Sequence, residues 1–208
     1  MKLLISFEGI DGSGKSTQMK LLSEKLKNIN IDNIVLREPG DTGISNDIRK
    51  ILLDKNNKIE PESETLLFLS SRSQLVKEKI IPNYKKEKVI LCDRYIDSTL
   101  AYQGYGRQLN KKLIKQLNIF VTRNIIPDIT FILDIDPKVS MNRLKIKNLD
   151  RMESLGVKFL ENVSKGYHQI ALDNPKRCKI IDCRTKDIIS IHNEIIHIFN
   201  LHTGKDIL

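Results

Sequence analysis

The stretch FEGIDGSGKST, residues 7–17, decides the fold of this chain. From Gly9 to Ser16 it matches the pattern G-x-x-x-x-G-K-[ST], in which glycines let the backbone wrap closely and point successive N–H groups at phosphate oxygens. A helix that follows adds the partial positive charge of its N-terminus. Lys15 is expected to reach the terminal phosphates of a bound chain, and the Ser16 hydroxyl to ligate Mg²⁺. The stretch therefore predicts a phosphate-binding loop between a strand and a helix.

Apolar runs and helical patterns alternate along the rest of the chain. The expected strands are KLLISF (2–7), NIVLR (33–37), KVILCD (88–93), DITFILDI (128–135) and KIID (179–182). Helical patterns are expected after the glycines up to about residue 29, over 61–85 with an end before Pro82, and near 110–124, 153–173 and 187–200. This alternation predicts an α/β fold with a parallel sheet of about five strands and helices on both faces, a three-layer sandwich. We expect one domain over 1–208, with a frayed tail at 201–208.

Composition and charge limit the classes of partner that we expect for this chain. No apolar run approaches the ~20 residues that span a bilayer, and the short apolar run at the start is interrupted at Glu8 without a cleavage site. We therefore expect a cytoplasmic protein with reduced cysteines and no membrane partner. The net charge of +9 attracts polyanions, but the lysines are spread along the chain and no nucleic-acid-binding motif is present. We expect no nucleic-acid partner.

A phosphate loop alone does not choose among GTPases, motor ATPases and small-molecule kinases. The chain has no N-K-x-D guanine signature, and its D-x-x-G lies inside the loop itself, from Asp11 to Gly14. With 208 residues there is little room for the coupling machinery of a motor. A kinase is favoured, and a kinase needs a second anion site opposite the loop and a lid that excludes water.

The second anion site is predicted at the ends of two strands. Arg37-Glu38-Pro39-Gly40 follows the second strand and Asp93-Arg94-Tyr95 follows the third, and the carboxyl ends of parallel strands open into the ligand crevice. Arginines there can clamp a phosphate through two of its oxygens, and Asp93 can stand near Mg²⁺. Phe68 and Arg72 are four residues apart on one expected helix face, suited to stacking on a base and bonding its edge. From spacing alone, a core Phe with a solvated Arg is the preferred alternative.

The motifs FEGIDGSGKST, REPG, LFLSSRSQ, DRYIDSTLAYQG, PDITFILDI and DRME, in this order, resemble the thymidylate kinase family of P-loop nucleoside monophosphate kinases. The resemblance runs from Lys2 to about Phe199, and the stretch 93–107 is its most specific part. It implies a P-loop kinase fold and transfer of the ATP γ-phosphate to dTMP, giving dTDP for dTTP biosynthesis. It also implies Mg²⁺ and a homodimer.

The resemblance also assigns residues to each nucleotide. The implied ATP site comprises Gly9, Ile10, Asp11, Gly12, Ser13, Gly14, Lys15, Ser16, Thr17 and Arg143, with Ser16 and Asp93 at the metal. For dTMP, Phe68 stacks on thymine, while Arg72 and Gln103 address its polar edge. Thr99 lies near the base, Tyr102 beside the sugar, and Asp11 at the 3′-hydroxyl. Arg37, Arg49 and Arg94 gather around the dTMP phosphate, with Glu38 nearby.

The resemblance also implies a short basic lid, about 143–153, of the bacterial type, because Ser13 stands where other members of the family carry an arginine in the loop. The lid carries Arg143, Lys145, Lys147 and Arg151, and cations that arrive with the substrates stabilise the transferring phosphoryl group. We expect Lys147 and Arg151 to be catalytic together with Lys15 and Arg94, and Arg143 to cover adenine. Which lid cation acts is left open, and a solvated basic face is the alternative for each.

One position departs from the family. Asp41 stands where R-E-P-G-G-T has its second glycine, and a carboxylate there weakens phosphate binding unless it points away or meets Arg49 or a metal. The mechanism expected is in-line transfer without a strong general base. Two alternatives remain: a kinase for another nucleoside monophosphate, and a catalytically silent nucleotide-binding or nucleic-acid-binding protein.

Overall fold

The computed structural model describes residues 1–144, 149–204 and 206. In this part of the chain, five parallel strands form one sheet in the order β2-β3-β1-β4-β5. The strands are β1 (Leu3–Glu8), β2 (Asn33–Arg37), β3 (Val89–Asp93), β4 (Ile129–Asp134) and β5 (Cys178–Asp182). They confirm the expected α/β class, and each strand lies within two residues of its predicted bounds. Because β1 is central, the phosphate loop that follows it opens at the middle of the sheet edge.

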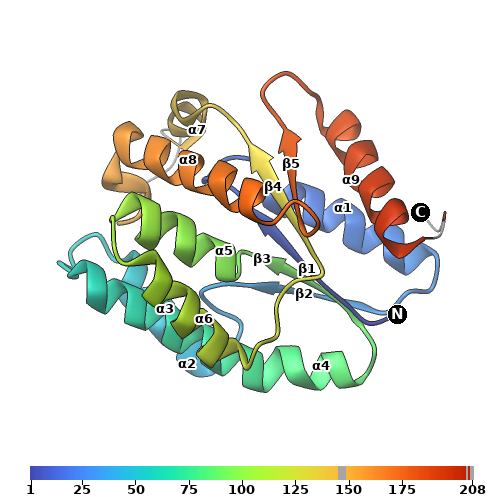
Figure 1. Cartoon of the computed structure of the whole chain (residues 1–208), viewed down its shortest axis with the longest axis horizontal. Coiled ribbons are helices and arrows are strands. Elements are labelled where there is room, and N and C mark those ends of the chain that lie inside the picture. The colour runs from blue at the N-terminus through green and yellow to red at the C-terminus, as the bar shows by residue number, and fades with distance from the viewer. Residues whose placement is uncertain (145–148, 205, 207–208) are drawn as a thin grey trace.

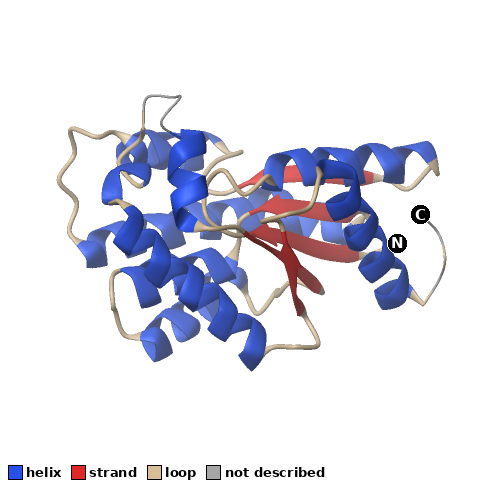
Figure 2. Ribbon diagram, turned by 90° about the horizontal axis from the view of Figure 1, so that it is seen from above, coloured by secondary structure: helices blue, strands red, loops and turns tan. Residues whose placement is uncertain are grey.

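Helices cover both faces of the sheet (Figures 1 and 2). They are α1 (Lys15–Asn28), α2 (Gly43–Leu53), α3 (Pro61–Leu75), α4 (Ile81–Lys85), α5 (Ile96–Thr99), α6 (Lys111–Thr122), α7 (Pro137–Leu144), α8 (Val157–Asp173) and α9 (Ile188–Thr203). Alternate residues of β1 serve the two sides, as the period of a strand requires. Ile5 and Phe7 belong to the core cluster that includes Leu22 and Leu26 of α1. Leu4 belongs to a second cluster with the end of α3.

The helix expected to end before Pro82 continues through it. A π-helical segment, Val76–Ile80, joins α3 to α4, and Pro82 lies in the first turn of α4. A proline is tolerated there because its missing N–H lies where the regular hydrogen-bond ladder is already interrupted. The expected end was therefore wrong, and the run from Pro61 to Lys85 is helical throughout.

Three helical segments had no counterpart in the sequence expectation: α2, α7, and α5 with the π-helical segment Leu100–Gly106 that extends it. The N-terminus of α2 is capped by Thr42, whose hydroxyl accepts from the backbone N–H of Ser45 at 3.1 Å. The last helix, α9, runs through Thr203 and ends at Gly204 with φ 65°. Residues 201–203 are thus helical, and the prediction of a tail frayed from residue 201 was wrong for them.

No helix in the described residues has the length and apolar character needed to cross a membrane.

The register of the sheet aligns the carboxyl ends of three neighbouring strands. Phe7 of β1 and Arg37 of β2 both pair with Asp93 of β3. The loops after these strands therefore begin at one edge of the sheet, where the site lies.

Candidate active site

The phosphate loop begins after β1 at Gly9, and no other residue fits there unless neighbouring atoms move. Gly9 has φ 129°, and a Cβ on it would lie 2.4 Å from the carbonyl oxygen of Leu133. Gly14, with φ 98°, precedes α1 and supplies no side-chain cap. The first N–H groups of α1 therefore remain available to an anion, as the motif predicts.

Lys15, the first residue of α1, is buried against the loop that precedes it. Its Nζ donates to the carbonyl oxygens of Gly9 at 3.1 Å and Ile10 at 3.0 Å. Burial, with the positive charge of Arg94, lowers the pKa of Lys15 to about 8, although Asp11 and Asp93 act in the opposite direction. The ammonium group is thus charged at neutral pH and lies within the loop that would receive phosphates.

Ser16 and Asp93 form the candidate metal site. The Ser16 Oγ donates to Asp93 Oδ2 at 2.8 Å, which joins the first turn of α1 to the end of β3. Both are oxygen ligands of the kind Mg²⁺ prefers, and Mg²⁺ is commonly bound through one or two carboxylates together with substrate phosphates. Among the described residues no group of three or more His, Cys, Asp or Glu side chains could hold a metal alone. The pair therefore fits a metal that arrives with a nucleotide.

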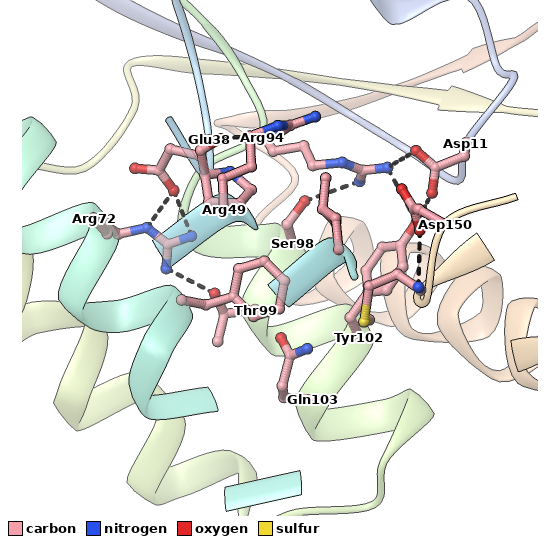
Figure 3. Close-up of a pocket in the computed structure, with 14 residues that line it drawn as sticks. Asp11, Glu38, Arg49, Arg72, Arg94, Ser98, Thr99, Tyr102, Gln103 and Asp150 are labelled. Atoms are coloured by element: carbon pink, nitrogen blue, oxygen red, sulfur yellow. Dashed lines mark hydrogen bonds and ion pairs between the residues drawn. The ribbon is translucent and has the colours of Figure 1, made fainter. Parts of the chain in front are cut away.

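Two pockets border the phosphate loop in the described part of the chain. The larger, about 550 Å³, is called here the phosphate pocket, and it is lined by Asp11, Gly12, Gly14, Lys15, Ser16, Thr17, Arg37, Glu38, Arg49, Asp93, Arg94, Arg143, Leu144 and Glu153. The smaller, about 90 Å³, is called the inner pocket (Figure 3). It is lined by Asp11, Glu38, Pro39, Arg49, Leu53, Phe68, Arg72, Arg94, Ser98, Thr99, Tyr102, Gln103, Asp150 and Met152. Because the two share Asp11, Glu38, Arg49 and Arg94, a molecule in one adjoins a molecule in the other.

The expected residues distribute between these pockets. All of the expected dTMP residues line the inner pocket except Arg37, which lines the phosphate pocket alone. Of the expected ATP residues, Gly9, Ile10 and Ser13 line neither pocket. The first two hold Lys15 through their carbonyl groups, and the Ser13 hydroxyl is buried without a hydrogen-bond partner in the described structure.

Arg94 stands where the two pockets meet. Its backbone has φ 72°, unusual for a residue other than glycine, and its guanidinium donates to Gly9 O at 2.9 Å and to Tyr102 Oη at 3.1 Å. It also forms an ion pair of 2.6 Å with Asp11. Burial would raise the pKa of Asp11, but the charges of Arg94 and Lys15 outweigh it and lower that pKa to about 2. Asp11 is therefore an anion throughout the physiological range.

Glu8, the last residue of β1, shares two hydrogen-bond partners, Ser98 and Tyr167, with Arg94. Sequence reasoning gave Glu8 no role. Its carboxyl group accepts from the Tyr95 N–H at 2.8 Å, from Ser98 Oγ at 2.6 Å and from Tyr167 Oη at 3.0 Å. Complete burial, together with the carboxylate of Asp97, raises the pKa of Glu8 to about 7. Its place between the strand and the glycine was visible in the sequence, but its partners on α5 and α8 were not.

Arg37 and Arg49 add positive charge beside Arg94. Arg49 donates to the Pro39 carbonyl at 2.9 Å, and burial together with the charge of Arg37 lowers the pKa of Arg49. Such a gathering of cations favours an anion between them. The carboxylate of Asp41 is bonded to the backbone of the same segment. Its Oδ2 accepts from the backbone N–H of Arg37 at 2.6 Å, and the residue lines neither pocket.

Arg72 is 2% exposed, so the alternative of a solvated arginine was wrong. Its guanidinium donates to Glu38, Thr99, Asn118 and the carbonyl oxygen of Tyr95 at 2.6–2.8 Å. Every nitrogen of the group is thus engaged, and a direct bond from Arg72 to a base edge would require an exchange of partners. Oε1 of the buried Glu38, by contrast, has no hydrogen-bond partner in the described residues, so a donor on a ligand can satisfy it.

The lid residues separate into two groups. Arg143 lies over the phosphate loop and donates to the Gly12 carbonyl at 2.8 Å. Arg151 lines neither pocket; it donates to Leu52 O and to Glu64 Oε2, both at 2.7 Å. Arg151 is therefore a buried structural cation here, which differs from the expected place beside the transferring phosphate. Lys145 and Lys147 lie outside the described residues.

A phosphate loop on an α/β sheet, with an arginine-lined pocket at the adjoining strand ends, defines a P-loop kinase acting on a small phosphorylated molecule. Comparisons with known proteins define it further. The family model described as Thymidylate kinase matches residues 7–195. The chain belongs to the thymidylate kinase family.

Relatives and a solved structure agree over nearly the whole chain. It is 48% identical to a thymidylate kinase of Thermosipho africanus over 202 residues, covering 96% of this chain and 98% of that one. A thymidylate kinase of Caldanaerobacter subterraneus is 44% identical over 192 residues, 92% of each chain. The crystal structure of thymidylate kinase from Ehrlichia chaffeensis superposes with a TM-score of 0.78 at 37% identity, covering 95% of this chain and 98% of that one.

Proposed function

We propose that this protein transfers the γ-phosphate of ATP to dTMP, forming dTDP and ADP. The observation that carries the proposal is the shared wall of the two pockets, where Asp11, Arg49 and Arg94 line both. A triphosphate held over the loop and a monophosphate held by the arginines would meet at this wall. Correct alignment of two reactants alone can lower a barrier by ~7–11 kcal/mol.

Each side of the transfer has its own residues. On the donor side, the N-terminus of α1 and Lys15 bind the phosphates, with Arg143 at the rim of the same pocket. On the acceptor side, Arg37, Arg49 and Arg94 bind the dTMP phosphate, Phe68 stacks on the base and Tyr102 borders the sugar. The acceptor is already a phosphate oxygen, so no strong general base is needed. Lys147 remains our proposal for the catalytic lid cation, while the contacts of Arg151 favour an anchoring role.

We further propose that Ser16 and Asp93 hold Mg²⁺. When bound, the ion would neutralise phosphate charge. Ser16→Ala is expected to raise the free Mg²⁺ needed for half-maximal rate by about 10–100-fold, the cost typical of losing a group that orients a metal site. An unchanged Mg²⁺ requirement would remove Ser16 from the site.

The test of the activity is ADP release from Mg·ATP in a coupled assay, with dTMP, dUMP, UMP, CMP, AMP and GMP offered separately. Fast turnover with dTMP, slower turnover with dUMP and negligible turnover with the others supports the proposal. Preference for AMP or CMP would leave the fold intact and identify another nucleoside monophosphate kinase. Folded protein that binds ATP but phosphorylates none of them would be a silent binder.

The expected homodimer, single domain and cytoplasmic location stay proposals. Exposed apolar side chains on α3 and α6 favour a dimer: Leu66, Leu113 and Phe120 are 55%, 51% and 79% exposed. These helices lie near one another (Figure 1). Light scattering after size exclusion should give twice the mass of 24.0 kDa, and Phe120→Asp should shift it towards the monomer. A monomeric wild type would contradict the homodimer.

A further inference from the structure

Glu8 at the end of β1 is a buried carboxylate whose hydrogen-bond partners are all neutral. They are one backbone N–H group and the hydroxyl groups of Ser98 and Tyr167. Among the described residues Glu8 forms no ion pair, whereas the nearby buried carboxylate of Asp97 is paired with Arg177 at 2.6 Å. A buried anion is costly unless it is compensated. Its compensation must therefore pass through the neutral partners.

The two hydroxyl groups connect Glu8 to Arg94. Ser98 Oγ and Tyr167 Oη donate to Glu8 Oε2 at 2.6 and 3.0 Å. Arg94 Nη1 donates to the same two hydroxyl oxygens at 3.2 and 3.4 Å. A hydroxyl group can do both at once, because it carries one hydrogen to donate and lone pairs to accept. Each hydroxyl group is thus a bridge between a buried anion and the guanidinium.

The charge of Glu8 sets the direction of these bridges. Burial and the charge of Asp97 raise the pKa of Glu8 to about 7, so the group is largely an anion at pH 8. A carboxylate without a proton can only accept, so the hydroxyl hydrogens point to Glu8 and the lone pairs are left for Arg94. A donor in place of Glu8 Oε2 would occupy lone pairs that the guanidinium uses. The network is therefore matched to a carboxylate at this position.

The bridges act on one nitrogen of Arg94 while substrate-facing residues hold the other. Nη1 donates to the two hydroxyl groups and to the carbonyl oxygen of Gly9. Nη2 donates to Asp11 and to Tyr102, which line the inner pocket. Figure 3 shows Arg94 extending between Ser98 and Asp11. Contacts to both nitrogens fix the plane of the guanidinium, and a misplacement of about 1 Å can reduce a rate by about 100-fold.

We propose that Glu8 is a positioning residue for phosphoryl transfer, which orients the Arg94 guanidinium through the two shared hydroxyl groups. This role rests on the proposed function, in which Arg94 aligns donor and acceptor. Glu8 lines neither pocket, so it acts without touching a substrate. A guanidinium that turns keeps its charge. Substrate binding is then largely retained, while the alignment needed in the transition state is lost, and kcat falls more than KM rises.

The test measures kcat and KM for dTMP at pH 8 in the wild type, Glu8→Gln and Asp128→Asn. Glutamine keeps the size of the side chain but can place a donor where the hydroxyl groups need an acceptor. We expect kcat of Glu8→Gln to fall by about tenfold or more, with KM changing by less than about threefold. Asp128→Asn is the matched control with unchanged kcat. Asp128 accepts from the Leu4 N–H at 2.8 Å, near the other end of β1, and lines neither pocket.

A double-mutant cycle with Arg94→Lys separates positioning from general damage. If Glu8 acts through Arg94, Glu8→Gln lowers kcat much less in the Arg94→Lys background than in the wild type. Each kcat is referred to the fraction of protein that binds ATP in calorimetry, which removes the contribution of unfolded protein. Equal falls in the two backgrounds overturn the proposal. An unchanged kcat in folded Glu8→Gln also overturns it, as does an equal fall in Asp128→Asn.

Tyr167→Phe replaces Glu8→Gln in the cycle if the latter does not fold. It removes one of the two bridges and lines neither pocket. Its kcat should fall by about threefold, the effect of one lost hydrogen bond, and this fall should disappear in the Arg94→Lys background. An unchanged kcat, or the same fall in both backgrounds, overturns the proposal.

Failure of the proposed function is distinguishable from failure of this role. A wild type that phosphorylates another nucleoside monophosphate would refute the proposed function, and the same cycle with that acceptor would still test Glu8. A wild type inactive with every acceptor would overturn both.

Discussion

Arg94 Nη2 and Asp11 Oδ1 lie 2.6 Å apart and join the turn after β3 to the phosphate loop. Both residues line both pockets, and the pair is only partly exposed. The contact holds the guanidinium at the junction before a substrate arrives, so little reorganisation is needed when a phosphate reaches it. Arg94 is the residue through which we expect donor and acceptor to be aligned.

Arg94→Lys keeps the charge but loses the planar fork that bonds Asp11, Tyr102 and Gly9 together. We expect kcat/KM for dTMP to fall by about 100-fold or more, the loss typical of removing one preorganised donor. Arg123→Lys, an exposed arginine outside both pockets, is the control for the same chemical change. Near-wild-type activity of Arg94→Lys would mean that the ammonium charge alone is sufficient.

The lowered pKa of Lys15 predicts that ATP binding weakens at alkaline pH. With a pKa of about 8 in the free protein, Lys15 is charged at pH 7 and largely neutral at pH 9. The dissociation constant for ATP, measured by calorimetry, should rise by up to about tenfold between these values, since each pKa unit corresponds to a factor of ten in the charged fraction. Lys15→Met should bind ATP weakly at both pH values. If the dissociation constant of Lys15→Met for ATP rose with pH as much as that of the wild type, another group would cause the pH dependence.

Glu8 predicts a pH-dependent contribution to stability. Its pKa is raised in the folded state from 4.5 to about 7, so the folded state favours the protonated form. The stabilisation is fully present below pH 4.5 and is lost as the pH rises through 7. Glu8→Gln imitates the protonated group and cannot ionise. Relative to the wild type, its free energy of unfolding should increase by about 2–3 kcal/mol between pH 4.5 and 8.

Urea denaturation of both Glu8 proteins at several pH values measures this difference. Tyr167→Phe, which removes one donor to Glu8 but no ionisable carboxyl, is the control for lost hydrogen bonding. If the difference in free energy of unfolding between the wild type and Glu8→Gln stayed constant with pH, the pKa of Glu8 would be the same in the folded and unfolded states.

Asp41→Gly tests whether the unusual carboxylate opposes the phosphate site. Because Asp41 binds the Arg37 backbone N–H and lines neither pocket, KM for dTMP should change by less than about threefold, as for other solvated charges. A glycine relieves the left-handed backbone at φ 65° but loses that hydrogen bond. A fall in KM of about tenfold or more would instead place the carboxylate in the electrostatic field of the phosphate.

The features that could be predicted correctly from the sequence depend on residues that are close together along the chain. The glycines, Lys15 and Ser16 of the phosphate loop act within one turn of chain, and each strand is an apolar run of a few residues. Helix α2 was missed although Thr42 caps it, because an isolated threonine is a weak signal. The helical run through Pro82 was misjudged because a π-helical segment relieves the penalty that proline normally carries.

The amino-acid sequence by itself determined the α/β class, the phosphate loop and the family, because these depend on periodicity and short motifs. Only the tertiary structure decided that Arg151 reaches Glu64 across 87 positions and that Arg72 reaches Glu38 across 34. A buried charge is costly unless it is paired, and the fold determines which partner lies within reach. The spacing of residues in a single sequence does not encode which of these charged side chains meet.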